Sequence, residues 1–256
     1  MTAVRTSHTH AQAVDAAIEL FSRQGYEQTT VEEIADAAQV SRATFFRRYR
    51  SKEDVVFADH ELLLEEVVVM LAATRPEALD DGEIPERSWD PTADPYLEVC
   101  RAARLVFDHH VGQRETSLAR YRLLQQVPAL RDRELVTTHR YERAFTKYLR
   151  DTLPPDRSST VHSIAFSAGV VALHNAILRR WLRNPELDLV PDLEDAFAEL
   201  RRGATADLMR RRELASGAAT LATSTRNADG ARVVVAYLEP GAGPEAVARA
   251  VRDALS

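Results

Sequence analysis

The chain has 256 residues, of which 45% are hydrophobic and 28% charged, and its formal net charge is −6. This length and composition allow one or two buried cores of ordinary size. The single cysteine, Cys100, excludes a disulfide framework within the chain and is typical of a reducing compartment. No uninterrupted apolar run approaches the about 20 residues that span a bilayer, and residues 1–14 lack the apolar core of a signal peptide. We therefore expect a cytoplasmic protein that makes no membrane contact.

The N-terminal sequence predicts two helices before residue 40. Apolar residues recur at helical spacing over 7–24, and Gly25 follows as a helix stop. Thr30 and Glu33 form a capping box, which predicts that the second helix begins at Val31. The apolar pattern of this helix breaks at residues 39–40, where the sequence indicates a turn.

A short basic helix is expected after this turn. Ser41 can cap it, and Phe45 and Tyr49 lie four residues apart, so they share an inward face. A local cationic helix on an acidic chain indicates an anionic partner, and the spacing fits a helix-turn-helix that reads duplex DNA. An ordinary solvated basic surface is the alternative. The stretch 42–52 contains no acid and five basic residues, Arg42, Arg47, Arg48, Arg50 and Lys52.

This segment resembles the N-terminal DNA-binding domain of the TetR family of bacterial transcriptional regulators. The resemblance covers about residues 11–57. It departs at Phe46, where the family usually has a tyrosine, so one hydroxyl contact to phosphate is missing. Arg47 and Arg48 can replace that contact, with a stronger dependence on salt. The positions that carry the resemblance are Ala16, Leu20, Phe21, Gly25, Thr30, Ile34, Ala35, Ala38, Val40, Ser41, Thr44, Phe46, Arg48, Tyr49, Lys52 and Val55.

A role follows for each exposed residue of the reading segment. We expect Arg42 and Thr44 to reach base edges and Ala43 to touch a thymine methyl group. Arg47, Arg48, Lys52 and Thr30 are expected to hold phosphates and set the register. Lys52 lies in the first turn of a third capped helix, where helix-end amides also favour an anion. The predicted DNA-binding residues are Thr30, Arg42, Ala43, Thr44, Phe46, Arg47, Arg48 and Lys52.

Beyond this segment the sequence predicts helices up to about residue 213. An acidic, proline-rich stretch at 75–95 interrupts them and is expected to be a lid, a loop or a short helix. The resemblance implies an all-α, TetR-like fold, in which a three-helix DNA-binding domain precedes a larger helical domain for ligand binding and dimerisation. The expected helices are 53–74, 95–111, 114–126, 128–152, 158–183 and 191–213.

A homodimer is expected, because one helix-turn-helix makes too few contacts to hold a DNA site. The segment 158–183 carries a stripe of small residues with Gly169, which suits close helix packing. The resemblance implies that 158–183 and 191–213 pair with their counterparts in a four-helix interface, and internal core is the alternative for the stripe. Twofold symmetry then requires a roughly palindromic operator in double-stranded DNA.

The resemblance also implies a small-molecule effector that fills a pocket among the middle helices and changes the spacing of the two reading heads. The sequences at 45–54 and 120–135 further resemble members that sense hydrophobic or acyl-CoA-like ligands. For each aromatic candidate, ordinary core is the alternative. The adjacent His109 and His110 point about 100° apart on a helix, so they make a poor metal pair. The candidate pocket residues are Trp89, Phe107, His110, Tyr121, Leu124, Gln125, Tyr141, Phe145, His174 and Trp181.

Residues 214–256 exceed the usual family length. The sequence predicts a β-hairpin from segments 219–225 and 231–240, followed by a helix at 244–255. Such an extension is too small to be stable alone, so we expect it to dock, and an undocked tail is the alternative. The predicted domains are therefore a DNA-binding domain at 1–54, a ligand-binding and dimerisation domain at 55–213, and the extension at 214–256.

Catalytic motifs are missing from the sequence, which has no GxSxG, HExxH or CxxC pattern. We therefore expect no enzyme activity, no cofactor and no metal. The main hypothesis is a ligand-released transcriptional repressor. The alternative is a helix-turn-helix adaptor whose middle domain binds a protein, for which an exposed apolar patch over 95–150 is expected instead of a cavity. An enzyme with an accessory helix-turn-helix is the third, remote possibility.

Overall fold

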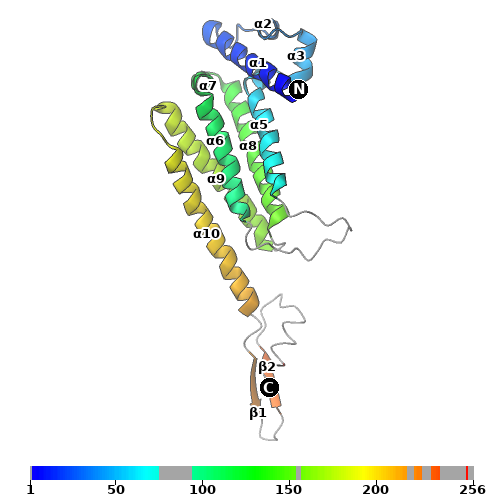
Figure 1. Ribbon diagram of the computed structural model, residues 1–256, viewed down its shortest axis with the longest axis vertical. Helices are drawn as coiled ribbons and strands as arrows, with labels where there is room; N and C mark the ends of the chain where they lie inside the picture. Colours follow the sequence, from blue (N-terminus) through cyan, green and yellow to red (C-terminus); the bar gives the residue numbers. More distant parts are fainter. Residues whose placement is uncertain are drawn as a thin grey trace. The chain divides into compact units, whose positions relative to one another are not determined.

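The computed structural model describes residues 2–74, 94–153, 157–217, 222–226, 232–236 and 252. The chain divides into two compact units, Met1–Arg201 and Arg202–Ser256. In the first unit, helices run side by side beneath a small N-terminal group of helices (Figure 1). The described part of this unit is entirely helical, in agreement with the expected all-α fold.

The N-terminal helices are α1 (Thr2–Gln24), α2 (Val31–Ala37) and α3 (Arg42–Arg48). The predicted capping box is present in both directions between Thr30 and Glu33, and Ser41 caps α3 by accepting from the N–H of Thr44. Gly25 ends α1 at φ 91° and donates to the carbonyl of Phe21 at 3.0 Å. Gln39 adopts φ 57° in the turn between α2 and α3, a left-handed conformation that permits the sharp change of direction.

The prediction of a single helix over 53–74 is wrong. The structure has two helices, α4 (Lys52–Val56) and α5 (Ala58–Ala73), which are separated at Phe57 with φ −117° and ψ 17°. Side-chain contacts explain the break, because Phe57 is buried while Asp54 and Asp59, on either side of it, pair with Arg133 and Arg120. Periodicity alone does not reveal these distant partners.

The remaining helices lie close to their predicted bounds. Proline at the first position begins both α6 and α8, as its fixed φ favours. The helices are α6 (Pro95–Gly112), α7 (Arg114–Gln126), α8 (Pro128–Thr152), α9 (Arg157–Arg183) and α10 (Val190–Gly217).

One hydrophobic cluster joins the N-terminal helices to the rest of the first unit. Phe21 and Phe45 are fully buried in it, and so are Val55 and Val56 of α4. The same cluster contains Leu123, Leu124 and Leu130 of α7 and α8. A movement of α7 or α8 therefore changes the packing beneath the DNA-binding helices.

Helix α9 contains a long apolar segment. Its segment Thr160–Arg183 is long and apolar enough to cross a membrane by length and composition alone, because an 18-residue window within it has a mean hydropathy of 1.5. Polar residues such as Ser167 and His174 interrupt this segment, so the expectation that the chain has no uninterrupted apolar run of about 20 residues holds for it. Phe166, Val170 and Trp181 are buried against neighbouring helices, as in the core helix of a bundle. A Cβ at Gly169 would lie 3.1 Å from Leu200 of α10, so this glycine permits the close helix approach that its position predicts.

The second unit contains two short strands, β1 (Ala222–Arg226) and β2 (Arg232–Ala236). They pair in antiparallel register, with Ala222 opposite Ala236 and Arg226 opposite Arg232. The expected turn and the helix expected at 244–255 lie outside the described residues, except residue 252, as does most of the stretch at 75–95. The C-terminal extension as a whole stays a prediction.

Candidate functional site

The predicted reading helix presents its basic side chains to solvent. Arg42, Arg47 and Arg48 are exposed on α3, whereas Phe45 and Tyr49 are buried beneath them. Phe46 is 46% exposed, although it is a large apolar side chain. The helix therefore separates into a packed face and a free basic face, as a DNA-reading helix requires.

Arg42 is held in place by two local contacts. Its Nε lies 2.9 Å from Oε1 of Glu32 on α2, and both side chains are exposed. Its guanidinium also lies 5.6 Å from the centroid of the Phe46 ring, a cation–π distance. Glu32 therefore engages the Nε side of the Arg42 guanidinium on the protein surface.

The two threonines of the predicted DNA-binding set take part in helix capping. The hydroxyl of Thr30 accepts from the N–H of Glu33 at 3.2 Å, and Oε2 of Glu33 accepts from the N–H of Thr30 at 2.8 Å. These contacts lower the pKa of Glu33. Thr44 is bonded through its own N–H to the Ser41 hydroxyl at 3.1 Å. Ala43, which lies in the first turn of α3 next to Thr44, is exposed.

Lys52 occupies a position that the sequence did not predict. Its Nζ donates to the carbonyl of Tyr26 at 2.8 Å and lies 3.8 Å from the centroid of the Tyr26 ring. The Tyr26 hydroxyl in turn bonds Glu53, the next residue of α4. Lys52 thus braces the start of α4 against the α1–α2 connection, and its predicted phosphate contact stays a prediction.

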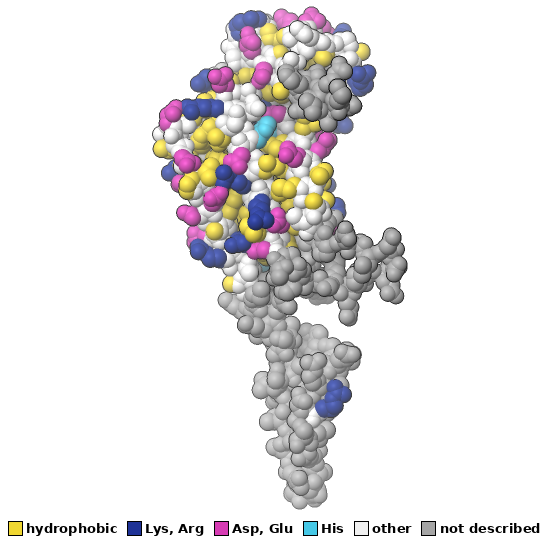
Figure 2. All heavy atoms as spheres, in the orientation of Figure 1, with side chains coloured by type: hydrophobic (Ala, Val, Ile, Leu, Met, Phe, Trp, Pro, Cys, Tyr) yellow, Lys and Arg dark blue, Asp and Glu magenta, His cyan; other side chains and the backbone are white. Residues whose placement is uncertain are grey.

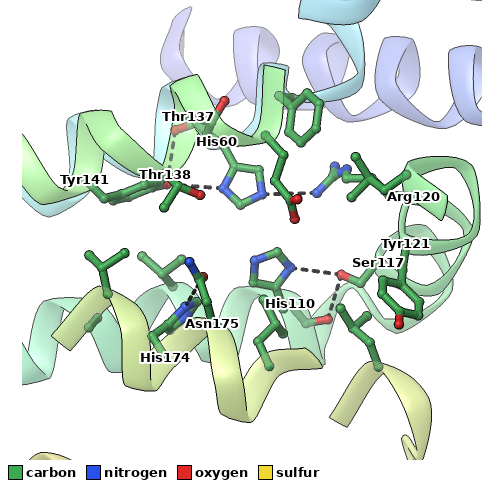
Figure 3. A pocket seen from close by; sticks show the side chains of 18 of the residues that line it. His60, His110, Ser117, Arg120, Tyr121, Thr137, Thr138, Tyr141, His174 and Asn175 are labelled. Carbon is green, nitrogen blue, oxygen red and sulfur yellow. Dashed lines mark hydrogen bonds between the residues drawn. The ribbon is translucent and has the colours of Figure 1, made fainter. Parts of the chain in front are cut away.

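A pocket opens among α5 to α9 of the first unit (Figure 3). The empty space between its lining atoms, with the open solvent at its mouth included, is about 730 Å³. Apolar walls come from residues such as Phe57, Val106 and Leu178, and polar groups converge from His60, His110, His174, Asn175 and Tyr141. Phe57 and His60 lie at the break between α4 and α5, directly after the DNA-binding helices.

The predicted pocket residues divide into those that line this pocket and those that do not. Phe107 and Trp181 are buried but outside the lining, Gln125 is exposed, and Trp89 lies outside the described residues. Helical periodicity indicates which residues are buried, but it does not distinguish the core from a cavity wall. The predicted residues in the lining are His110, Tyr121, Leu124, Tyr141, Phe145 and His174.

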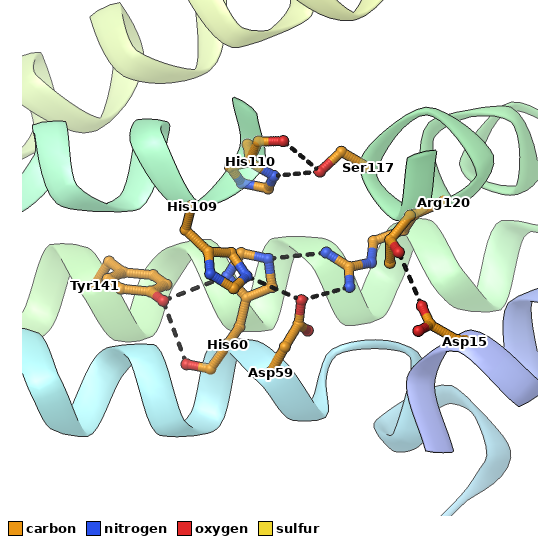
Figure 4. A network of polar contacts seen from close by, with 9 residues as sticks. Asp15, Asp59, His60, His109, His110, Ser117, Arg120 and Tyr141 are labelled. Atoms are coloured by element: carbon orange, nitrogen blue, oxygen red, sulfur yellow. Dashed lines mark hydrogen bonds and ion pairs between the residues drawn. The ribbon is translucent and has the colours of Figure 1, made fainter. Parts of the chain in front are cut away.

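A polar network that the sequence did not predict reaches the pocket through His60, Arg120 and Tyr141 (Figure 4). The guanidinium of Arg120 contacts Oδ2 of Asp59 at 2.7 Å and Nε2 of His60 at 3.1 Å. Nδ1 of His60 lies 3.3 Å from the Tyr141 hydroxyl, which donates to the His60 carbonyl at 3.2 Å. Nε2 of His109 lies 3.2 Å from the same Asp59 oxygen.

The charges of this network are set by burial and pairing. Burial opposes ionisation of Asp59, but Arg120 and the neighbouring histidines outweigh it and hold the pKa of Asp59 well below its usual value. Desolvation lowers the pKa of His60 to about 3 and that of His174 to about 4, and it holds the pKa of His110 well below its usual value. At neutral pH the pocket therefore contains three uncharged imidazoles.

The sequence does not indicate this network, because each of its members fits a more common role. Asp59 and His60 fall within a segment expected to be one continuous helix, and Arg120 lies in a basic run that fits a solvated surface. Among the described residues, no group of three or more potential ligands is arranged to hold a metal ion.

These features define the class of protein as a helix-turn-helix DNA-binding protein with a helical effector domain. Residues 13–58 match the family described as bacterial regulatory proteins, tetR family, and residues 94–205 match the MftR C-terminal domain. The chain belongs to the TetR family of DNA-binding transcriptional regulators. The relatives named below are regulators, not enzymes, in agreement with the expectation that this chain has no enzyme activity.

Two relatives and one solved structure illustrate the similarity. The transcriptional regulator TcmR of Streptomyces glaucescens is 55% identical over 47 residues, which are 18% of this chain and 21% of that protein. MftR of Mycobacterium tuberculosis, whose name connects it with mycofactocin biosynthesis, is 27% identical over 203 residues, covering 75% of this chain and 89% of that protein. A TetR-family regulator from Syntrophomonas wolfei shares the fold, with a TM-score of 0.51, 14% identity, and coverage of 78% of this chain and 96% of that chain.

Proposed function

We propose that this protein is a homodimeric repressor that leaves a palindromic operator when a small hydrophobic molecule fills the pocket. The observation that carries the proposal is the position of the pocket, whose wall includes Phe57 and His60 at the α4–α5 break. A ligand there changes the packing at the point where the DNA-binding helices join the effector domain. Its affinity must differ between the two spacings of the reading heads, because equal affinity shifts no equilibrium.

The proposed domains are a DNA-binding domain at 1–54, an effector and dimerisation domain at 55–213, and an extension at 214–256 comprising a β-hairpin and a helix. The proposed location is the cytoplasm. On the face drawn in Figure 2, acidic and basic side chains are interspersed over the helical part, which limits nonspecific attraction to DNA away from α3.

Two ligand types agree with the apolar walls. One is an acyl-CoA-like molecule, as the sequence resemblance implies, and the other is a compact hydrophobic molecule held entirely inside the pocket. The adaptor alternative requires an exposed apolar patch over 95–150. The large apolar side chains exposed in the described part of that range are Val111, Leu135 and Val136. Three such residues make a smaller feature than the pocket, so a small-molecule effector is favoured.

Selection of binding sites from a randomised duplex library tests the DNA-binding proposal. We expect the selected sites to have twofold symmetry. Arg42→Ala should change the preferred bases, whereas Arg47→Ala should weaken all sequences alike and reduce the slope of log affinity against log salt by about one. Unsymmetrical sites, or unchanged binding in both variants, would contradict the assignment of α3 as the reading helix.

Lys52 allows a separate test of its role as a brace. Lys52→Met keeps the alkyl stem but removes the ammonium from the Tyr26 carbonyl and ring. We expect the melting temperature to fall by about 2–6 °C, because a lost charged hydrogen bond costs about 1–2 kcal/mol in a protein of this size. Arg47→Met serves as the control, since Arg47 is exposed. Equal melting temperatures, together with weaker DNA binding, would assign Lys52 to phosphate contact alone.

A further inference from the structure

The hydrogen bonds around the pocket fix the tautomers of its buried histidines. Nδ1 of His174 lies 3.2 Å from the side-chain carbonyl oxygen of Asn175, which only accepts, so Nδ1 carries the proton. Nε2 of His174 is then a bare acceptor. It is buried and has no hydrogen-bond donor among the described residues.

His110 adopts the same tautomer for a similar reason. The Ser117 hydroxyl donates its proton to the His110 carbonyl at 3.0 Å, so its oxygen can only accept from Nδ1 of His110, 3.3 Å away. The proton therefore lies on Nδ1, and Nε2 of His110 has a free lone pair. The two rings line the same wall of the pocket, with centroids 6.2 Å apart (Figure 3).

The charged residues of the lining already have partners. Arg120 is bound to Asp59 and His60, and Glu134 lies 3.7 Å from Arg179. Asp59 therefore balances the charge of Arg120, so a carboxylate or phosphate group would find no unbalanced positive charge there, although the buried N–H at Nε of Arg120 has no hydrogen-bond partner among the described residues. Such an anionic group would also place its own lone pairs against the lone pair of His174, a repulsive arrangement.

From these contacts we infer that the pocket takes an uncharged, mainly apolar ligand. The ligand donates a hydroxyl or N–H hydrogen bond to Nε2 of His174, and Nε2 of His110 can accept a second one. This inference rests on the proposed function and chooses between its two ligand types. The acyl chain and thioester of an acyl-CoA-like molecule offer no donor, and its several phosphates are anionic. A molecule with an apolar body and a hydroxyl group, such as a phenol, matches the site in polarity and charge.

The buried Nε2 of His174, which has no hydrogen-bond donor among the described residues, determines how strongly the pocket prefers a ligand with a donor group. A buried acceptor that faces an apolar group loses its hydrogen bond to water and receives none in return. A ligand that lacks the donor leaves this cost in place, whereas a ligand that has it removes the cost. The site therefore rejects an ether or an alkane of the same size.

Binding of a matched series to the full-length protein tests the inference. The probes are 2-naphthol, 2-methoxynaphthalene and 2-naphthoate, titrated by calorimetry without DNA. We expect 2-naphthol to bind about tenfold more tightly than either analogue. Equal or tighter binding of the methyl ether or the carboxylate would overturn the inference, and so would undetectable binding of 2-naphthol up to its solubility limit.

Variants assign the preference to the histidine. In His174→Phe, we expect 2-naphthol and its methyl ether to bind alike, whereas His174→Gln, which keeps an acceptor, should retain part of the preference. His139→Gln is the control, because His139 is exposed and outside the pocket lining. A preference unchanged in His174→Phe would overturn the assignment to this residue. Should the phenylalanine variant fail to fold, the wild-type series and His174→Gln still decide.

Failure of the inference and failure of the proposed function give different results. If lauroyl-CoA binds and releases selected operator DNA in a gel shift while 2-naphthol does not bind, the repressor proposal stands and the ligand class is wrong. If 2-naphthol binds with the expected preference but selected DNA is never released by any pocket ligand, the ligand class stands and the repressor proposal fails.

Discussion

Arg42 is paired with Glu32 before any DNA is present, and this pairing affects how strongly the reading helix binds. The contact orders a long side chain, and it also places a carboxylate beside a residue that is predicted to contact DNA. Exposed ion pairs are weak, so the repulsion between Glu32 and DNA should outweigh the benefit of ordering.

We therefore expect Glu32→Gln to bind operator and unrelated duplex DNA about threefold to fivefold more tightly, with its base preference unchanged. The reason is that a negative charge is removed while the amide can still accept from Arg42. Fluorescence anisotropy at several salt concentrations measures the effect, which should shrink at high salt. Glu65→Gln makes the same charge change at an exposed position of α5 and serves as the control. Weaker binding in Glu32→Gln would mean that the ordering of Arg42 matters more.

At the scale of helices, the pocket histidines make stability depend on pH, because they are buried where α5, α6 and α9 meet. The unfolded imidazoles take up protons below about pH 6.5, whereas the pKa values of His60 and His174 in the folded protein are about 3 and about 4. The unfolded state then binds more protons, so the free energy of unfolding falls as the pH falls below about 6.5. The loss approaches about 1 kcal/mol per pH unit for each such imidazole. Asp59 adds to it only at more acidic pH, below its ordinary pKa of 3.8.

We expect the melting temperature to fall by several degrees between pH 7 and pH 5, by about 2–4 °C for each kcal/mol lost. His174→Phe should show a shallower fall, because it lacks one of these imidazoles. His139→Gln should follow the wild type. Glu134 acts in the opposite direction, because burial raises its pKa, so its contribution decreases stability as the pH rises. A melting temperature independent of pH over this range would show that the imidazoles are hydrated in the folded protein.

The sequence predicted the helical elements better than the joints between them. Local signals such as the capping box at Thr30 and the prolines at the starts of α6 and α8 correctly indicated helix ends, because each acts within one turn. The break at Phe57 depends on Asp59 and Arg120, which are 61 residues apart and meet only in the folded chain. The same limitation applies to the pocket, since the orphaned Nε2 of His174 is defined by distances between helices.

At the scale of the whole molecule, the apolar face of α9 needs a partner. Val161 and Ile164 are 62% and 48% exposed on this helix, next to a run of small residues. TetR-family regulators act as dimers, and a second copy of the chain would bury these side chains. The proposal of a palindromic operator depends on this pairing, because one reading head alone contacts only a half-site.

Ile164→Glu should therefore convert the dimer to a monomer, because a carboxylate in the apolar centre of the interface loses its hydration without gaining a partner. We expect light scattering after size-exclusion chromatography to report about half the wild-type mass, and affinity for the full operator to fall to that for a half-site. Val69→Glu is the matched control, since Val69 is 68% exposed on α5. If Ile164→Glu remained dimeric with full operator affinity, the interface would have to lie on another face, and the spacing of the two reading heads would no longer be set by α9.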